Sequence, residues 1–523
     1  MVRKGTRTRG HAITVRNGVG QLSLILWVIL CHCRKAAGFG IMRGMKNSKK
    51  RSLLYVVIVA AIGGFLFGFD SGVISGCEQA IQAEFGLTGF WHGLIVSGAL
   101  IGTVIGVFTA GAPSDRWGRK KTLWLMGTLF LVSAIGCAFT LTSKTIGPHM
   151  LGWFRFIGGL AIGGVSVVVP LYIVEVSPGP LRGRLVATNQ LNIVFGILIS
   201  YVSNYFVARW MAVDGGWFNG LCQWLAGVFA SNPMTTEMVK WRVMLGMECL
   251  PIFLFMALLV TIPESPRWLV RVGRKEEAHD VLDSIGYPEV DKTVGEIEVS
   301  LREAQGGVSV PLFQRKYLKP ILLAFFIAFF NQVSGINAIN YYAPRIFDMI
   351  FGEGSEMASL AGTMGVGAVN LTFTILAFFI IDKFGRRVMI IGGASLMIVM
   401  HSLVAWQLSL GDQCNSTLAV LGILGFIAFF ACSSGAVIWV YISEVFPNAV
   451  RAKGQALGCF THWFMCTIIS WAFPVVAEKA GTWAFGFFAF MMLVQVLWAV
   501  FFMPETKGGT TEDIEARLGI AAN

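Results

Sequence analysis

From Leu53 onward, long apolar runs alternate with short charged connectors. A helix that crosses the roughly 30 Å hydrocarbon core of a bilayer needs about 20 apolar residues. Runs of this length without strict alternation are helical, because only helices and closed barrels satisfy their backbone groups in lipid. The pattern predicts an all-α membrane protein with twelve transmembrane helices, over residues 53–76, 91–112, 122–142, 150–174, 186–208, 243–262, 319–345, 358–381, 387–411, 417–442, 453–476 and 482–503.

The charges between these runs predict which side of the membrane each connector faces. Alternate connectors are rich in Lys and Arg, which gather on the cytoplasmic side of membrane proteins. An even number of crossings places both termini on that same side. We therefore expect a multi-pass protein of a cell membrane, either bacterial inner or eukaryotic plasma membrane, with both termini in the cytoplasm. The basic connectors hold Arg116, Arg119, Lys120 and Lys121; Arg182 and Arg184; Lys383, Arg386 and Arg387; and Arg451 and Lys453.

Two of the basic connectors repeat one another, which indicates a duplicated chain. Asp115-Arg116-Trp117-Gly118-Arg119-Lys120 is matched by Asp382-Lys383-Phe384-Gly385-Arg386-Arg387. Parallel repeats of this kind place a substrate site at their interface, near the middle of the membrane. We expect two six-helix pseudo-repeats, namely an N-terminal bundle over 53–262 and a C-terminal bundle over 319–503, with a cytoplasmic helical linker over 263–318 and a short cytoplasmic tail over 504–523.

The repeated charges predict a gating network at the cytoplasmic ends of the bundles. They would pair across the ends of the helices and hold the two halves together when the outside is open. The simpler interpretation is that they only anchor the connectors on the positive side. The network residues are Asp115, Arg116, Arg119, Glu175, Arg182, Asp382, Arg386, Glu444 and Arg451.

Residues 1–52 form a basic tail of a different character. Twelve of the 41 Lys and Arg residues and none of the 29 Asp and Glu residues fall within 1–51, so the net charge of +12 lies in the tail. This placement argues against a nucleic-acid partner. The apolar run over 21–33 is too short to span a membrane. Three interpretations stay open: a disordered cytoplasmic tail, an anchor on the membrane surface, or residues that are untranslated because synthesis starts at Met42 or Met45, which we favour.

Three ionisable residues lie inside the predicted membrane helices: Asp70, Arg155 and Glu248. Such a residue costs about 2.5–3.5 kcal/mol on insertion scales, so each is a candidate functional residue. A carboxylate beside an arginine holds its charge, and one whose partner moves away takes up a proton. A carboxylate whose partner changes with conformation can therefore carry a proton across the membrane. A static Asp–Arg strut is the alternative.

A second set of intramembrane polar and aromatic residues is neutral. Amides donate and accept hydrogen bonds, which suits hydroxyl groups better than ions, and aromatic faces suit the C–H face of a pyranose. Amides can instead join helices for about 0.6 kcal/mol each, but the span over 319–345 holds more of them than this requires. His462 is open to three roles: a proton site, a hydroxyl donor or a packed neutral imidazole. The set is Gln190, Asn331, Gln332, Asn337, Asn340, Tyr341, Tyr342, Asn370, Trp439, His462 and Trp463.

Seven short motifs occur in a fixed order between about residues 50 and 510. They are Gly-Phe-Asp-Ser-Gly (68–72), Asp-Arg-Trp-Gly-Arg-Lys (115–120), Arg155-Phe-Ile-Gly-Gly, Pro170-x-x-x-x-Glu175 with Arg182-Gly183, Pro263-Glu-Ser-Pro-Arg-Trp, Gln332-Val-Ser-Gly-Ile-Asn337 with Tyr341-Tyr342-Ala-Pro, and Pro504-Glu-Thr-Lys-Gly. Each is weak alone, but in this order they are specific. Together they resemble the sugar porter family of the major facilitator superfamily. The resemblance implies the major facilitator fold and transport of a monosaccharide by alternating access.

Within that family the pattern is similar to the bacterial xylose–proton symporters, which carry acids at the positions of Asp70 and Glu248. The facilitative glucose carriers of animals typically lack both acids. The resemblance implies proton symport with Asp70 as the coupling acid, Arg155 as its partner and Glu248 in support. It also implies sugar contacts from Gln190, Gln332, Asn337, Asn370 and Trp439, with Phe67 and Tyr341 as aromatic walls.

Three residues depart from the pattern of the family. The usual Gln-Gln pair begins here with Asn331, which has a shorter reach to a hydroxyl. The amide that usually precedes Trp463 is His462. The usual Gly-Pro is Gly435-Ala436, so we expect a stiffer hinge there. The first two departures leave the identity of the sugar open, and the third bears on the rate.

The sequence thus predicts a proton-coupled symporter for a pentose or hexose such as xylose or glucose. A facilitative uniporter on the same fold, or a sugar sensor that does not transport, are the alternatives. We do not expect an enzyme, because no catalytic constellation stands outside the membrane helices. The expected partners are a monosaccharide, a proton and the lipid bilayer, without nucleic acid, cofactor or metal.

Overall fold

The computed structural model describes residues 52–213, 216–229, 234–306, 310–352, 354–508 and 511–520. Within these residues every regular element is a helix, and twelve helical stretches are long and apolar enough to cross a membrane. The predicted all-α fold with twelve transmembrane helices is thereby confirmed. The tail before Ser52, with its three interpretations, lies outside the described residues.

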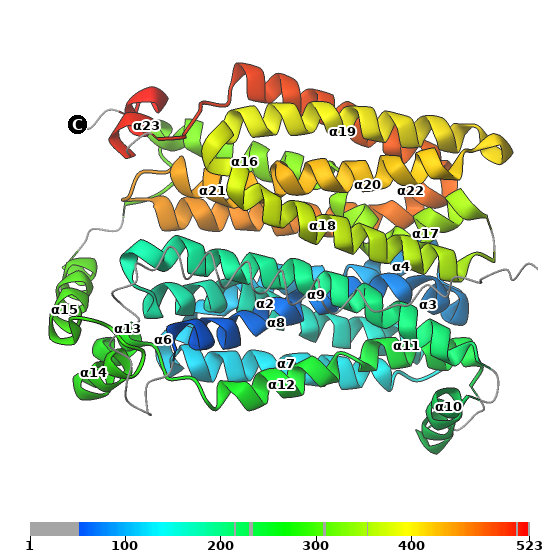
Figure 1. Ribbon diagram of the computed structural model, residues 1–523, viewed down its shortest axis with the longest axis horizontal. Coiled ribbons are helices and arrows are strands. Elements are labelled where there is room, and N and C mark those ends of the chain that lie inside the picture. The colour runs from blue at the N-terminus through cyan, green and yellow to red at the C-terminus, as the bar shows by residue number, and fades with distance from the viewer. Residues whose placement is uncertain are drawn as a thin grey trace, which may run out of the picture.

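The two halves of the chain form two layers of helices, which Figure 1 shows one above the other. The spans of the first half are α2 (Leu53–Val73), α4 (Gly89–Val96) with α5 (Gly98–Thr109), α7 (Arg119–Ala138), α8 (Ile146–Val176), α9 (Arg182–Met211), and α11 (Thr236–Gly246) with α12 (Cys249–Leu259). The spans of the second half are α16 (Leu318–Val333) with α17 (Ile336–Phe351), α18 (Glu356–Phe384), α19 (Arg386–Ser409), α20 (Ser416–Cys432) with α21 (Ser434–Glu444), and α22 (Arg451–Phe501), which holds two spans.

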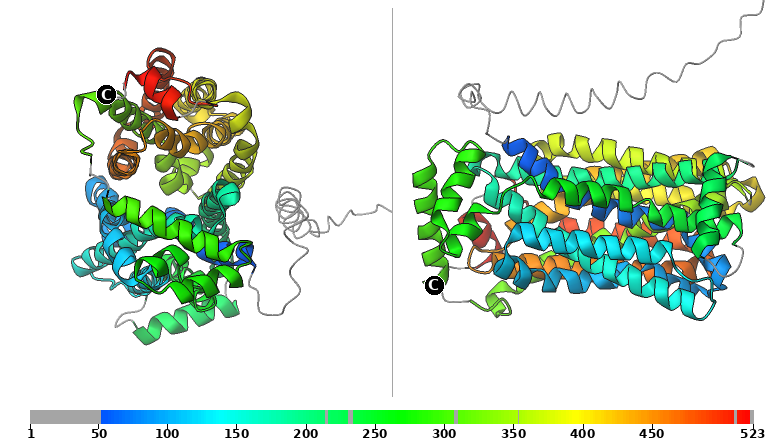
Figure 2. Two further views of the ribbon diagram at one scale, coloured as in Figure 1. Left: turned by 90° about the vertical axis from the view of Figure 1, so that its left-hand side faces the viewer. Right: turned by 90° about the horizontal axis from the view of Figure 1, so that it is seen from below.

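Short helices mark the two ends of the bundle (Figures 1 and 2). At one end, here called the linker end, lie α6 (Gly111–Trp117), α13 (Pro266–Arg271), α14 (Lys275–Ser284), α15 (Val290–Gly306) and α23 (Thr511–Leu518). At the opposite end, here called the distal end, lie α3 (Glu78–Phe85) and α10 (Trp217–Phe229). The polar stretch that joins the halves is therefore helical and gathered at a single end.

Glycines let the helices of the first half approach closely. A Cβ on Gly68 of α2 would lie 1.9 Å from the carbonyl oxygen of Ile193 in α9. A Cβ on Gly159 of α8 would lie 1.9 Å from the carbonyl oxygen of Ala99 in α5. In lipid, close backbone packing of this kind takes the place of the hydrophobic effect in holding helices together.

Four spans that the apolar pattern predicts as continuous are interrupted, at the junctions of α4 with α5, α11 with α12, α16 with α17 and α20 with α21. The span predicted over 319–345 breaks between α16 and α17, where Gly335 has a φ of +87°. The span predicted over 417–442 breaks between α20 and α21 at Ser433. Irregular backbone at membrane depth is tolerated only where protein or a cavity surrounds it. These last two breaks border the cavity described below.

Prolines free two further backbone carbonyls, and tyrosines satisfy both. Pro344 in α17 has no N–H to donate to the carbonyl oxygen of Asn340, four residues earlier. Tyr201 of α9, in the other half, donates its hydroxyl to that oxygen over 2.9 Å. Pro474 in α22 likewise leaves the carbonyl oxygen of Ser470 without a donor. Tyr342 of α17 donates its hydroxyl to that oxygen over 2.9 Å. The first of these bonds joins the two halves of the protein.

Candidate functional site

A cavity of about 510 Å³ lies between the two halves. Along α9 it reaches from Tyr201 to Gly183, the second residue of this helix, at the linker end. The remaining walls come from α2, α5, α8, α16, α17, α18, α20, α21 and α22. It brings together all ten residues that the sequence suggests for substrate binding, namely Phe67, Gln190, Asn331, Gln332, Asn337, Tyr341, Asn370, Trp439, His462 and Trp463.

The break between α16 and α17 presents a chain of linked amides to this cavity. Asn337 donates from Nδ2 to Oε1 of Gln332 over 2.5 Å, and Gln332 donates from Nε2 to Oδ1 of Asn331 over 2.9 Å. Asn331 in turn donates over 3.1 Å to the carbonyl oxygen of Ser434, beside the second break. Linked amides are held in fixed orientations, and their unused donors and acceptors suit a ligand with several hydroxyl groups.

Aromatic rings line another part of the cavity wall. Phe67 of α2 and Trp463 of α22 lie in different halves, with ring centroids 5.4 Å apart. The ring of His462 lies 4.8 Å from that of Trp439 and 5.1 Å from that of Trp463. Nδ1 of His462 is also 3.1 Å from Nε2 of Gln332. This histidine therefore joins the amide chain to the aromatic wall.

The cavity also holds polar residues that sequence reasoning does not single out. Ser71, Asn189 and Thr374 line it, and Thr374 donates from Oγ1 to Oδ1 of Asn370 over 3.4 Å. Helical spacing could have identified two of these residues as cavity-lining, because Asn189 adjoins Gln190 and Thr374 lies one turn beyond Asn370. Serine and threonine rarely stand out in a membrane helix, since their hydroxyls can bond to the preceding turn.

A buried ionic group lies beside the cavity, at the residue before Ser71. Arg155 of α8 donates from Nη1 to Oδ1 of Asp70 over 2.6 Å, and each side chain is 1% exposed. Glu248, between α11 and α12, is 2% exposed and faces Asp70. Neither Oδ2 of Asp70 nor Oε1 of Glu248 accepts a hydrogen bond from the described residues. The three predicted ionisable residues thus form one group of two carboxyls and one guanidinium.

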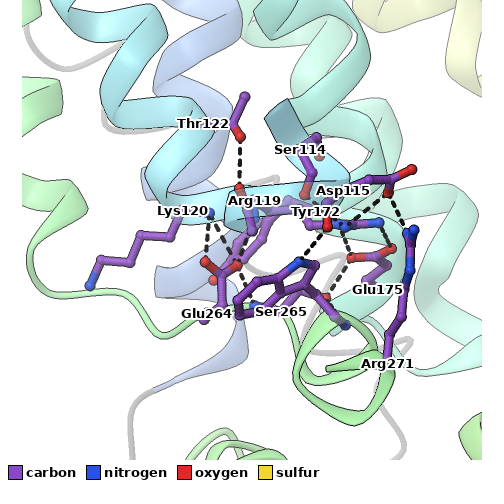
Figure 3. Close-up of polar contacts among 12 residues, drawn as sticks. Ser114, Asp115, Arg119, Lys120, Thr122, Tyr172, Glu175, Glu264, Ser265 and Arg271 are labelled. Carbon is purple, nitrogen blue, oxygen red and sulfur yellow. Dashed lines mark hydrogen bonds and ion pairs between the residues drawn. The ribbon is translucent and has the colours of Figure 1, made fainter. Parts of the chain in front are cut away.

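The repeated charges of the first half form a compact group at the linker end (Figure 3). Arg119 donates from Nη2 to Oε1 of Glu175 over 2.8 Å. Glu264 accepts from the backbone N–H groups of Arg119 and of the next residue, at 2.9 and 3.1 Å. Asp115 pairs with Arg271 of α13 at 2.6 Å. These bonds fasten α7 to α8, α6 to α13, and the segment between α12 and α13 to α7, all within the first half.

The second half repeats this arrangement. Arg386 donates from Nη2 to Glu444 over 2.9 Å, and Glu505 accepts from two successive backbone N–H groups at 2.9 Å each. Burial alone would raise the pKa of Glu505, but these and further backbone N–H groups outweigh it and hold the pKa below its usual range. For the more deeply buried Glu264, burial prevails over its backbone donors and raises the pKa.

The other predicted network residues lie near these two groups. Arg116 and Arg182 are exposed, and Arg451 donates from Nε to the carbonyl oxygen of Phe446 over 3.3 Å. The side chain of Asp382 lies outside the described part of the structure. The charge pairs named above join helices of one half, so pairing between the halves at the linker end stays a prediction for a different conformation.

Comparisons with known proteins agree on one family. The chain matches the family described as sugar (and other) transporter over residues 56–518. It is 35% identical over 492 residues to the D-xylose-proton symporter of Escherichia coli K12, covering 88% of this chain and 94% of that protein. It is 34% identical over 474 residues to the glucose transport protein of Synechocystis, covering 88% of this chain and 97% of that protein. The solved inward-open structure of the xylose transporter XylE from E. coli shares 33% identity and a TM-score of 0.75, covering 89% of this chain and 99% of that one.

Proposed function

The chain belongs to the sugar transporter family, and from this premise we propose that it is a proton-coupled monosaccharide symporter that works by alternating access. It is a multi-pass membrane transporter and not an enzyme. Pentoses and hexoses such as xylose or glucose are the proposed substrates. One observation carries the proposal: a buried Asp70–Arg155 pair with a second carboxyl, Glu248, stands directly beside a cavity of amides and aromatic rings.

The proton site follows from the count of charges. Two facing carboxyls that share one guanidinium in an apolar interior cannot both stay ionised, so one of them holds a proton. Asp70 keeps its charge while Arg155 contacts it, and a proton on Asp70 releases the arginine. Because Ser71 and Gly72 line the cavity, a change at Asp70 is transmitted to the substrate through the same turn of α2.

The sugar site follows from the amides and rings. A monosaccharide presents hydroxyl groups around its rim and a C–H face, which match the chain through Gln332 and the rings of Phe67 and Trp463. Residues of both halves contribute, so a bound sugar would draw the halves together. We propose that the bundles over 53–262 and 319–503 rock about this site while the linker over 263–318 joins them.

From the basic connectors we propose that the linker end faces the cytoplasm, together with both termini. The cavity then faces inward in this structure, because it reaches the linker end while ion pairs join the halves at the distal end. We propose that the motif charges at the linker end pair between the halves when the protein opens outward.

Sugar-evoked proton movement tests the coupling. Purified protein in proteoliposomes should take up a proton with each sugar, so the addition of xylose or glucose should make the external medium more alkaline. Sugar uptake without alkalinisation would favour a uniporter, and binding without uptake would favour a sensor. Competition of labelled uptake by a panel of monosaccharides identifies the preferred sugar in the same preparation.

Two amides of α9 provide a matched test of the cavity. Gln190→Ala should raise the KM for sugar about tenfold, the cost of one hydrogen bond of roughly 1.4 kcal/mol, with little change in kcat. Asn192→Ala is the control, because its Nδ2 donates over 2.9 Å to the carbonyl of Thr188 and its side chain does not line the cavity. Equal KM values for the two variants would exclude Gln190 from the sugar site.

A further inference from the structure

We propose that His92 is a second proton-binding site, separate from Asp70, which takes up its proton when the two halves part at the distal end. The site lies outside the central cavity. The inference rests on the proposed function only in assigning the distal end to the outside of the membrane. It is carried by a buried ionic cluster in which α3 and α4 of one half meet α17 of the other (Figure 1).

The cluster is built around Glu78, the first residue of α3, whose side chain is fully buried. His92 of α4 is also fully buried and donates from Nε2 to Oε2 of Glu78 over 2.7 Å. Arg345 of α17 donates from Nε and Nη2 to the two carboxylate oxygens, at 3.0 and 2.7 Å. One carboxylate therefore accepts from both halves, and Arg345 is the member that leaves when the halves separate.

The state of His92 in the closed cluster follows from its two ring nitrogens. Nε2 donates to Glu78, whereas Nδ1 is buried and has no hydrogen-bond partner among the described residues. A proton on Nδ1 would lack an acceptor and would place two cations against one carboxylate in a buried site. His92 is therefore neutral while the cluster is closed, and Arg345 balances the charge of Glu78.

Separation of the halves reverses this balance. In the closed cluster Glu78 accepts a hydrogen bond from His92, and the charge of Arg345 offsets its own. Once Arg345 leaves, Glu78 keeps its charge only if another cation replaces it. His92 can be that cation when water reaches Nδ1, because a protonated imidazole donates from both ring nitrogens and would then have an acceptor for each. Since the proton binds the separated arrangement more tightly, acid outside favours opening at the distal end.

The other charged groups that face the cluster are already partnered. On opening, Asp348 and Glu478 each lose an amide donor of the other half. Glu356 loses Lys240, which stays paired with Glu237 in its own half. The ring of Tyr342 lies at a centroid distance of 6.2 Å from that of His92, and its hydroxyl donates to the carbonyl oxygen of Ser470. The described partners are Gln79 with Asp348 at 2.8 Å, Gln82 with Glu478 at 3.0 Å, Glu84 with Arg242 at 2.7 Å, and Lys240 with Glu237 and Glu356 at 2.5 and 2.6 Å.

The test measures opening at the distal end directly. Spin labels on cysteines at Ala83 of α3 and Ala358 of α18, exposed positions in opposite halves, report the separation when the native cysteines are replaced by Ala. In an Asp70→Asn protein, lowering the pH from about 8 to about 5 should raise the ratio of separated to closed molecules about tenfold. Asp70→Asn with His92→Gln keeps an N–H donor that cannot be protonated, and should show the same ratio at both pH values.

A second variant keeps the test decisive if the His92→Gln protein does not fold. Glu78→Gln removes the carboxylate that holds both partners, so the distal end should be separated already at pH 8, with no further change at pH 5. A pH response of unchanged size in the His92→Gln protein, or none in its parent, contradicts the proposal. The proposed symport is judged separately, because normal sugar accumulation by Asp70→Asn would refute coupling at Asp70 without affecting the label distances.

Discussion

Replacing Asp70 by Asn should abolish uphill accumulation of sugar while sparing the exchange of labelled sugar across the membrane. The amide preserves the shape of the carboxyl but cannot carry a proton, and it no longer attracts Arg155, whose Nη1 lies 2.6 Å from Oδ1. Exchange requires only that the loaded protein changes conformation, whereas accumulation requires the proton gradient. We expect accumulation to fall to the level of equilibration.

Proteoliposomes with an imposed proton gradient measure both quantities on the same preparation. Asp412→Asn is the matched control, since this exposed carboxylate lies in the short 3-10 turn after α19, far in sequence from the buried group. It should accumulate sugar like the unaltered protein. Full accumulation by Asp70→Asn would show that the Asp70–Arg155 pair is a static strut. Loss of both accumulation and exchange would instead point to a structural defect.

The second large effect concerns folding. Gly159→Ala should lower the free energy of unfolding by at least about 2 kcal/mol, because its Cβ would lie 1.9 Å from the carbonyl oxygen of Ala99. Backbone cannot yield as a flexible side chain can, so α5 and α8 must move apart along their contact. We expect a lower yield of folded protein and a lower midpoint of thermal unfolding in detergent.

Gly152 lies on the same helix and provides the control. A Cβ at Gly152 would meet no atom within 4 Å, so Gly152→Ala should be neutral or slightly stabilising, since alanine favours helix over glycine. The difference between the two alanine variants isolates the helix contact from the general effect of losing a glycine. Equal midpoints for both would contradict the close approach of α5 and α8.

Much of the architecture could be predicted from the sequence because the bilayer imposes one simple requirement on every span. Apolar length alone located the twelve helices, although α9 runs on to Met211 and α11 already begins at Thr236. The helix breaks at Gly335 and Ser433 could not be predicted, because a break is fixed by bonds to other helices. Asn331 and Ser434 show this, being 103 residues apart in sequence yet hydrogen-bonded.

The candidate site was predicted where the chemistry is unusual for a membrane helix. Amides such as Gln332 and ionisable residues such as Asp70 are costly in lipid and therefore conspicuous. The burial of Glu78 could not be predicted, because a carboxylate in a connector is ordinarily exposed to solvent. Its burial depends on Arg345, 267 residues further along the chain. Only the packing of the two halves brings these side chains together.

The hydrogen bond from Tyr201 to the carbonyl oxygen of Asn340 has a consequence for the temperature dependence of transport. Pro344 leaves that oxygen without a donor in its own helix. When the halves separate at the distal end, the oxygen loses the hydroxyl of Tyr201 and has no donor until water reaches it. An unmade buried hydrogen bond costs about 1–3 kcal/mol. This cost falls on the transition between the two end states and is chiefly enthalpic. The distal end should therefore open as a discrete, thermally activated event, and turnover should slow steeply on cooling.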